Sequence, residues 1–309
     1  LIYGEFIEPF WGAVMKYDKH PLTFEQQIDR LIERGLNVPN RSLAIRTLQT
    51  ISYYRLSAYF LPFQKESNKF DEGVKFEDIF QLYEFDRRFR LIFMDAIEWV
   101  EVGFRAHLTY YLAHQKTFGP WGYIDVKNFE GHFKHQEWLD KVREDVKISK
   151  EVFVRHFFDK YSEHGDLPLW MMTEVISLNR LSIFFRFLKK EYRHGLAQEF
   201  YDLPSQVLAS WLESLTYIRN VCAHHSRLWN RDLPVSPKIP RGAKQWQSYS
   251  KKVFNVVMVF RNVIPQADRW SKFAGDLASL IDSYPQVNLK AMGFPENWNE
   301  ALLDGRNKG

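Results

Sequence analysis

The sequence predicts an all-α protein, a helical bundle preceded by an additional helical region. The main observation is a run from Phe76 to about His114 in which apolar residues recur at spacings of three and four. No proline interrupts this run, and Gly103 is its one glycine. Such a pattern is typical of a long amphipathic helix. The second observation is that the period-two alternation of strands is nearly absent from the chain. The protein is therefore expected to be all-α.

Composition limits the class of protein without identifying it. A chain of 309 residues that is 45% hydrophobic can bury one large core or two smaller ones. The formal net charge of +4 is compatible with an anionic partner but does not establish one. The single cysteine, Cys222, excludes an internal disulfide and a thiolate metal cluster, and it fits a reducing compartment. Residues 1–14 lack the basic lead of a signal peptide, and Val253 to Ile264 is too short and polar to span a bilayer. We expect a cytoplasmic protein without a membrane partner.

The first part of the chain, residues 1–70, is expected to form a separate helical region. Residues 1–20 have no clear period and are expected to be an arm. Thr23 and Gln26 form a capping-box pattern that begins a helix, and Gly35 is a suitable stop. A second helix is expected over about Arg41 to Tyr59, with inward-facing Leu43, Leu48, Ile51 and Tyr54.

The bundle is expected to occupy residues 71–285, with a C-terminal tail over residues 286–309. A connector rich in proline, Leu233 to Gly242, is expected before its last two helices. Beyond the long helix, the periodicity predicts helices at about His135–Lys147, Lys150–Tyr161, Leu169–Lys190, Pro204–Cys222, Ala243–Val263 and Ala267–Ser283.

The chemistry of the chain is expected in one stretch, Tyr217 to Arg231, where an apolar helical run changes abruptly to arginine, asparagine and histidine. On a helix, Asn220 and His224 share a face, and Arg219 lies one step around from it. An arginine offers a planar donor fork for phosphate, and histidine exchanges protons near neutral pH. The stretch is therefore a candidate site for phosphodiester chemistry. Polar residues at a helix end are also often only caps, and a histidine near the C-terminus of a helix interacts favourably with the helix dipole.

The order Arg219-Asn220-x-x-x-His224 resembles the signature of the HEPN superfamily of RNases. The longer string from Arg219 to Arg231 resembles the Abi-like abortive-infection proteins, as do the segments Ile51–Tyr59 and Leu82–Arg90. The resemblance implies a bundle of HEPN type and a metal-independent endoribonuclease that leaves 2′,3′-cyclic phosphate ends. It also implies a role in antiphage abortive infection, or as the toxin of a toxin–antitoxin system.

The same resemblance implies partners. HEPN RNases generally place two such motifs face to face, and this chain has one, so the expected active unit is a homodimer with Arg219, Asn220 and His224 as catalytic residues. RNA is the expected substrate, and an inhibitory partner, such as an RNA, is expected by family analogy. No metal or organic cofactor is implied. A zinc site at Cys222, His224 and His225 matches no familiar ligand spacing.

Several neighbours of the motif carry two interpretations each. His225, Arg227 and Arg231 are expected to bind RNA. His225 could instead bond a local carbonyl, and the arginines could pair with carboxylates at the helix end. Trp170, Trp211 and Trp229 are expected in the core rather than as base-stacking platforms.

Glu98, Glu101 and Arg105 form a stripe on the long helix, in a pattern similar to one in Abi-like proteins. The resemblance implies that Glu98 or Glu101 orients Arg219 from across the core. The alternatives are an exposed Glu101–Arg105 pair or a network that holds neighbouring helices.

Two other functions remain open. A non-catalytic module could use the same basic cleft to hold a structured RNA, since phosphate binding needs Arg219 but not proton transfer by His224. A helical interaction protein that senses a phage protein would use the motif for structure alone.

Overall fold

A computed structural model describes residues 20–66, 68–161, 163–243, 251–264 and 266–303. The fold is all-α, as predicted, apart from a small hairpin of β1 (Gln64–Glu66) and β2 (Lys69–Phe70). The expected arm falls almost entirely outside the described residues, as does the beginning of the helix expected from Ala243. The chain forms two compact units, Leu1–Gln81 and Leu82–Gly309.

The first unit contains three helices before the hairpin, namely α1 (Phe24–Glu33), α2 (Arg41–Thr50) and α3 (Tyr53–Ser57), followed by the short η1 (Leu61–Phe63). The capping box that begins α1 is confirmed: the Thr23 side chain accepts from the Gln26 backbone N–H at 3.3 Å, and the Gln26 side chain accepts from the Thr23 N–H at 2.9 Å. Gly35 follows the helix end with a φ of 90°, which glycine adopts at little cost.

The expected helix from Arg41 to Tyr59 is interrupted. Ile51 is extended, and the Ser52 hydroxyl accepts from the backbone N–H of Arg55 at 3.3 Å, so a new helix begins there. A serine hydroxyl offers the backbone this alternative to continuing a helix. Tyr54 is consequently 88% exposed, and its predicted inward orientation is wrong.

The second unit is organised around α4 (Phe76–Ala113), which begins in the first unit. Its length confirms the helix predicted from Phe76 to about His114. The remaining helices are η2 (Val126–Asn128), α5 (His135–Ile148), α6 (Val152–Lys160), α7 (Leu169–Val175), α8 (Leu178–Phe187), α9 (Lys190–Tyr201), α10 (Ser205–Ala223), α11 (Phe254–Val263), α12 (Ala267–Ser283), η4 (Lys290–Met292) and α13 (Trp298–Leu303).

Between Leu169 and Tyr201 the structure differs from the prediction by one break and one additional helix. The expected helix from Leu169 to Lys190 is two helices, because Ile176 is extended and the Ser177 side chain caps α8 by accepting from the Arg180 N–H at 3.4 Å. Helix α9 was not predicted. Its sequence is rich in polar residues and contains Gly195, both of which weaken a helical pattern.

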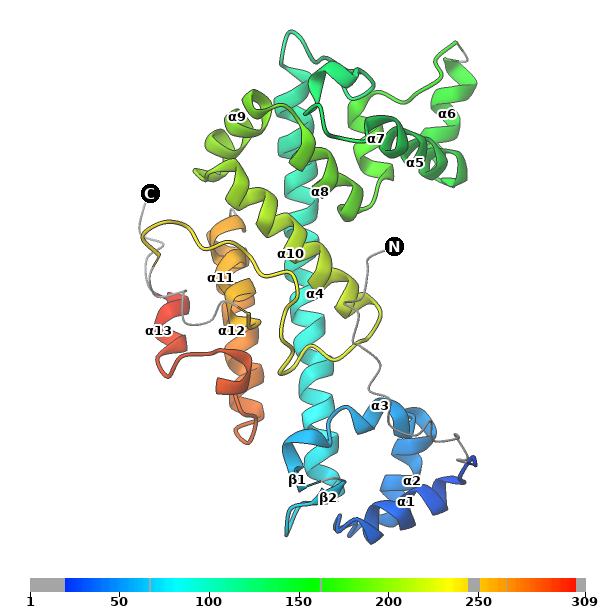
Figure 1. Cartoon of the computed structure of the whole chain (residues 1–309), viewed down its shortest axis with the longest axis vertical. Coiled ribbons are helices and arrows are strands. Elements are labelled where there is room, and N and C mark those ends of the chain that lie inside the picture. Colours follow the sequence, from blue (N-terminus) through cyan, green and yellow to red (C-terminus); the bar gives the residue numbers. More distant parts are fainter. Residues whose placement is uncertain (1–19, 67, 162, 244–250, 265, 304–309) are drawn as a thin grey trace, which may run out of the picture. The chain divides into compact units, whose positions relative to one another are not determined.

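Phenylalanines along α4 form much of the core. Phe85, Phe89, Phe93 and Phe104 are fully buried. The Phe93 ring lies 5.3 Å from Phe260 of α11 and 6.0 Å from Phe273 of α12, and Phe104 lies 5.4 Å from Phe185 of α8. In the second unit α11 and α12 therefore lie beside α4, and α5, α6 and α7 gather near its C-terminal end (Figure 1). Each such aromatic pair contributes about 0.5–1.5 kcal/mol beyond the burial of its area.

Among the described residues, no helix combines the length and the apolar character that crossing a membrane requires.

Candidate functional site at the end of helix α10

The motif Arg219-Asn220-x-x-x-His224 lies where α10 ends. The helix packs against α8, α9 and α11, and its apolar residues, including Ile218, Val221 and Cys222, are buried. In contrast, Arg219, Asn220 and His224 are exposed. The sequence pattern thus gives one helix end with a buried apolar side and an outward set of a guanidinium, an amide and an imidazole.

A local backbone motif terminates the helix. The backbone N–H of Ser226 donates to the carbonyl of Val221 at 2.9 Å, and that of His225 donates to Cys222 at 3.0 Å, which together form a Schellman motif. The position that glycine usually occupies in this motif is held by His225, with a φ of 55°. A left-handed conformation costs a residue with a Cβ atom about 1–2 kcal/mol. Such strain is often found at functional sites, and here it falls directly after His224 of the motif.

The chain after the motif is fixed from within the core by Asp86 of α4. Its fully buried carboxylate accepts from the backbone N–H of Trp229 at 2.6 Å and from that of Leu228 at 3.2 Å. Arg90, one turn later in α4, forms an ion pair with the same carboxylate and is also buried. The loop that follows His224 therefore rests on a buried charge pair rather than on apolar packing alone.

Asp86 and Arg90 also affect the thiol next to the motif. Burial and, to a smaller extent, the negative charge of Asp86 together raise the pKa of Cys222 to about 12, while Arg90 opposes the rise. A thiol with so high a pKa is neutral at physiological pH and is neither a nucleophile nor a metal ligand.

Tyr217 extends the exposed face of α10. It precedes Asn220 by three residues and His224 by seven, so the three lie along one side of the helix. The Tyr217 hydroxyl accepts a hydrogen bond from Arg231 Nη1 at 2.9 Å, and both side chains are partly buried. The hydrogen bond holds a second guanidinium beside this face. Arg219 Nη1 donates to Asn220 Oδ1 over a longer 3.5 Å.

A separate arrangement on α4 involves Glu98, Glu101 and Arg105. Arg105 is buried and forms an ion pair with Glu101, and it donates to the carbonyl oxygens of Thr173 at 2.9 Å and Ile176 at 3.0 Å. It thereby joins α4 to the end of α7. Glu98 is exposed, and neither glutamate forms an ion pair with Arg219 among the described residues. Of the alternatives considered, the geometry matches a network that holds neighbouring helices.

The remaining expectations have mixed outcomes. Trp211 and Trp229 are buried as predicted, but Trp170 is 50% exposed, and its predicted place in the core is wrong. It is the second residue of the short α7, one position after the buried Leu169.

His225 is exposed and Arg227 is half-buried, so both are accessible. Their predicted contact with RNA stays a prediction. In the part of the chain that the structure describes, no three His, Cys, Asp or Glu side chains are arranged to hold a metal ion.

Comparison with known protein families identifies the family of the chain. The family model described as Abi-like protein matches residues 46–230, which is more than half of the sequence. The chain belongs to the Abi-like protein family. The Abi-like match includes the segments Ile51–Tyr59 and Leu82–Arg90 and most of the motif region, and it is consistent with a role in abortive infection. Comparison with curated proteins and with solved structures gives no match.

Sequence reasoning missed Tyr217, Asp86 and Arg90. The spacing of Tyr217 from Asn220 and His224 is a helical signal that could have identified it. Asp86 and Arg90 lie in the segment Leu82–Arg90, which carries the family resemblance, but the contact of Asp86 with the motif loop spans 142 positions of sequence or more. No local pattern reveals a contact of that range.

Proposed function

We propose that this Abi-like protein is a metal-independent endoribonuclease of HEPN type that acts in antiphage abortive infection or as the toxin of a toxin–antitoxin system. The observation that carries the proposal is the outward set of Arg219, Asn220 and His224 at the end of a buried helix. Its support is a strained His225 and a buried Asp86–Arg90 pair beneath the following loop.

The reaction requires proton transfer and charge stabilisation. A base removes the proton of a ribose 2′-OH, and the 2′-oxygen attacks the adjacent phosphorus. The bond from phosphorus to the 5′-oxygen breaks, and an acid returns a proton to that oxygen. The products are a 2′,3′-cyclic phosphate and a 5′-OH. His224 is the proposed proton-transfer group, a role that typically contributes 10²–10⁴-fold.

Arg219 is the proposed stabiliser of charge. Its guanidinium can bind two non-bridging phosphate oxygens at once, and it stabilises the charge that develops on them in the transition state. Asn220, which accepts from Arg219 Nη1, can keep this fork oriented or donate to phosphate through its amide. His225, Arg227 and Arg231 are the proposed contacts to flanking RNA.

The motif of one chain contains a single histidine of the family pattern, His224, whereas the reaction needs both a base and an acid. We therefore propose a homodimer in which two copies of Arg219 and His224 line one basic cleft. An inhibitory partner, such as an RNA, would restrain the toxic activity.

Cleavage of a mixed RNA pool in EDTA tests this proposal. Wild-type protein should cut RNA and leave cyclic phosphate ends, while Arg219→Ala and His224→Ala should lose at least about 10²-fold in rate. His194→Ala is the matched control, because His194 is an exposed histidine on α9 away from the motif. If wild-type protein that has been stripped of co-purified RNA still does not cut, the proposal that it is an endoribonuclease is wrong. Binding of RNA through Arg219 in that protein would instead support the non-catalytic RNA-binding module.

The dimer has its own test. Wild-type protein mixed with an excess of His224→Ala protomers should lose more activity than dilution explains, because a mixed cleft keeps one histidine and so lacks either the base or the acid. Activity in proportion to the wild-type fraction, with mixed dimers demonstrated, would contradict a shared cleft.

A further inference from the structure

A groove lies between α4 and α7 in the larger unit, at residues remote in sequence from the α10 motif. Its volume is about 500 Å³. Ala106, Thr109 and Ala113 of α4 line it with small side chains, whereas Tyr110 of α4 and Trp170 of α7 line it with large rings. A groove between two helices is a place where a ligand or a partner can bind.

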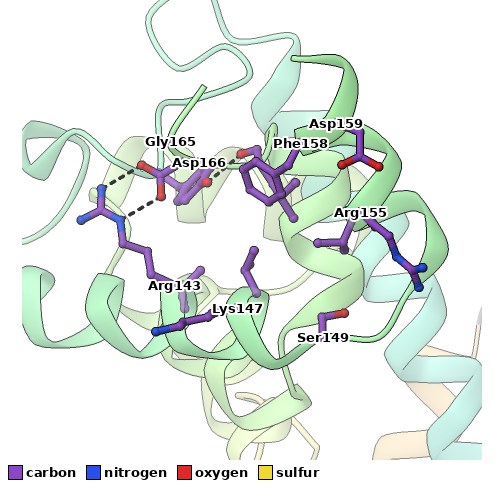
Figure 2. Close-up of a pocket in the computed structure, with 13 residues that line it drawn as sticks. Arg143, Lys147, Ser149, Arg155, Phe158, Asp159, Gly165 and Asp166 are labelled. Carbon is purple, nitrogen blue, oxygen red and sulfur yellow. Dashed lines mark hydrogen bonds and ion pairs between the residues drawn. The ribbon is translucent and has the colours of Figure 1, made fainter. Parts of the chain in front are cut away.

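A cavity of about 470 Å³ between α5 and α6 differs from this groove. There Arg143 donates to both oxygens of Asp166 at 2.8 Å, so these charges are paired with each other. The charged ends of Lys147 and Arg155 point away from the cavity (Figure 2). Of the two, the groove between α4 and α7 is the one whose exposed aromatic and charged groups share one opening.

Arg105 holds the two walls of the groove together. Its buried guanidinium forms an ion pair with Glu101 on the same helix and donates to the carbonyl oxygens of Thr173 at 2.9 Å and Ile176 at 3.0 Å. The hydroxyl groups of Thr109 and Thr173 form a further hydrogen bond of 2.9 Å. The groove is thus preformed, and Glu101 already neutralises the charge of Arg105.

The two rings that line the groove are open to solvent. Trp170 is 50% exposed and Tyr110 is 58% exposed. The His114 ring packs on Tyr110 at 4.4 Å, and its Nδ1 donates to the Tyr110 carbonyl at 2.7 Å, so this wall is held from one side. No ring or cation of the described residues lies on the Trp170 ring. Exposed apolar surface of this kind marks sites at which a partner binds.

The charge of the groove favours a cation. Glu174 lines it with an exposed carboxylate that has no ion-pair partner in the described part of the chain. Trp170 and Glu174 are four residues apart on α7, so they share a face. Aromatic faces attract ammonium and guanidinium groups, as at Trp99 of this chain, whose ring centre lies 3.2 Å from the Arg269 guanidinium carbon. A phosphate, by contrast, would be repelled by Glu174 and would meet an Arg105 whose charge is neutralised.

The surface continues along α4 beyond the groove. Glu98, Val102 and Ala106 follow one another at a spacing of four, so they lie on one face of the helix over about 12 Å. Val102 is 56% exposed, and Glu98 is also exposed. A small organic cation would cover only the rings of Trp170 and Tyr110. A polypeptide segment with basic and apolar side chains would cover the rings and Val102 together and would meet a second carboxylate at Glu98.

We infer that the groove between α4 and α7 docks a basic segment of a partner protein, with an arginine or lysine side chain against the rings of Trp170 and Tyr110 and its charge at Glu174. Apolar side chains of the same segment cover Val102. The surface shares no residue with the motif of α10, so the inference does not rest on the proposed cleavage. If the protein is an endoribonuclease, docking here gives a protein partner a place from which to restrain or release it.

Selection from a random peptide library tests the inference. The target is the full chain carrying His224→Ala, so that RNA stays intact, and enriched peptides are then titrated by fluorescence anisotropy. We expect these peptides to combine arginine or lysine with apolar residues. Trp170→Ala and Glu174→Gln should each weaken their binding by at least about 10-fold, as loss of an interface anchor does. Trp121→Ala and Glu144→Gln are the matched controls and should leave binding unchanged, because both residues are exposed and neither lines the groove.

Three results would overturn the inference. The first is that no peptide is enriched, that enriched peptides have no excess of basic residues, or that Trp170→Ala and Glu174→Gln do not weaken their binding. The second is that a short oligoribonucleotide binds and depends on Trp170, while no basic peptide does, which would assign the groove to RNA. The third is that spermidine binds as tightly as the peptides, which would assign it to a small cation.

The variants keep these outcomes separate from misfolding and from the proposed cleavage. Trp170 and Glu174 are both exposed, so their variants should fold, and circular dichroism checks this. RNA cleavage by the wild-type protein is measured separately, so failure of either proposal leaves the other standing.

Discussion

Replacing Asp86 with asparagine should destabilise the larger unit strongly, because this carboxylate joins the core to the motif loop. The Asp86 side chain is 0% exposed and that of Arg90 is 5% exposed. Asp86→Asn removes one charge of a buried ion pair, and breaking such a pair costs about 3–5 kcal/mol. An asparagine oxygen at the Oδ1 position can still accept from the N–H groups of Leu228 and Trp229, but its NH₂ group then faces the Arg90 guanidinium, which also only donates. A buried donor left without an acceptor adds about 1–3 kcal/mol, part of which overlaps with the first cost.

Urea unfolding at pH 7, followed by far-ultraviolet circular dichroism, measures this cost. Glu84→Gln is the matched control, since Glu84 pairs with Arg87 on the same helix but the Arg87 side chain is 45% exposed. An exposed pair contributes about 0.2–1 kcal/mol. The account requires Asp86→Asn to lower the free energy of unfolding by several times more than Glu84→Gln. Equal losses below about 1 kcal/mol in both variants would refute the argument that a buried charge supports the loop.

Three further predictions concern single residues. Cys222 should react with iodoacetamide far more slowly in the native protein at pH 8 than in urea, because burial and the charge of Asp86 raise its thiol pKa to about 12; fast native labelling would contradict this. His225→Gly should raise the free energy of unfolding by about 1 kcal/mol or less, since glycine adopts its φ of 55° without strain, and Asn230→Gly should gain less, because asparagine tolerates its φ of 49° better than histidine does; a loss of stability in His225→Gly would show that the ring itself holds the loop. Burial lowers the pKa of His107, whose ring stacks on Phe200 at 4.4 Å, so the unfolded chain binds the proton more readily than the folded one, and stability should fall as pH drops below about 6.5. His107→Phe should remove part of the wild-type loss of stability between pH 7 and pH 5, and identical pH profiles of the two proteins would refute that assignment.

The sequence predicted the helices whose burial pattern is strong. The long α4, the capped start of α1 and the extent of α10 all follow from apolar spacing and cap chemistry. The failures lie where a local hydrogen bond competes with a continuing apolar pattern. Ser52 and Ser177 each begin a new helix within a run that reads as one, and the exposure of Tyr54 follows from the first of these breaks. Helix α9 was missed for the opposite reason. Its local sequence pattern is weak, and tertiary packing stabilises the helix in spite of that pattern.

The residues of the candidate site could be named from the sequence, but the contacts that hold the following loop in place could not. The order of Arg219, Asn220 and His224 is a local signal on one helix end. The anchoring of the loop by Asp86 depends on a contact across 142 residues, and the strain at His225 depends on backbone geometry that composition does not specify. Glu101 shares a helix with Arg105 and forms an ion pair with it, so the orientation of Arg219 by Glu98 or Glu101 stays a prediction.

The central claim is that RNA is cut by chemistry that begins at a ribose 2′-OH and uses Arg219 and His224. The most direct measurement is cleavage, in EDTA, of an RNA with a single 2′-deoxy sugar at a mapped cleavage position. The account predicts that wild-type protein no longer cuts at that position and still cuts the other positions to 2′,3′-cyclic phosphate ends. Undiminished cutting at the deoxy position would contradict the account, because the proposed nucleophile would then be absent.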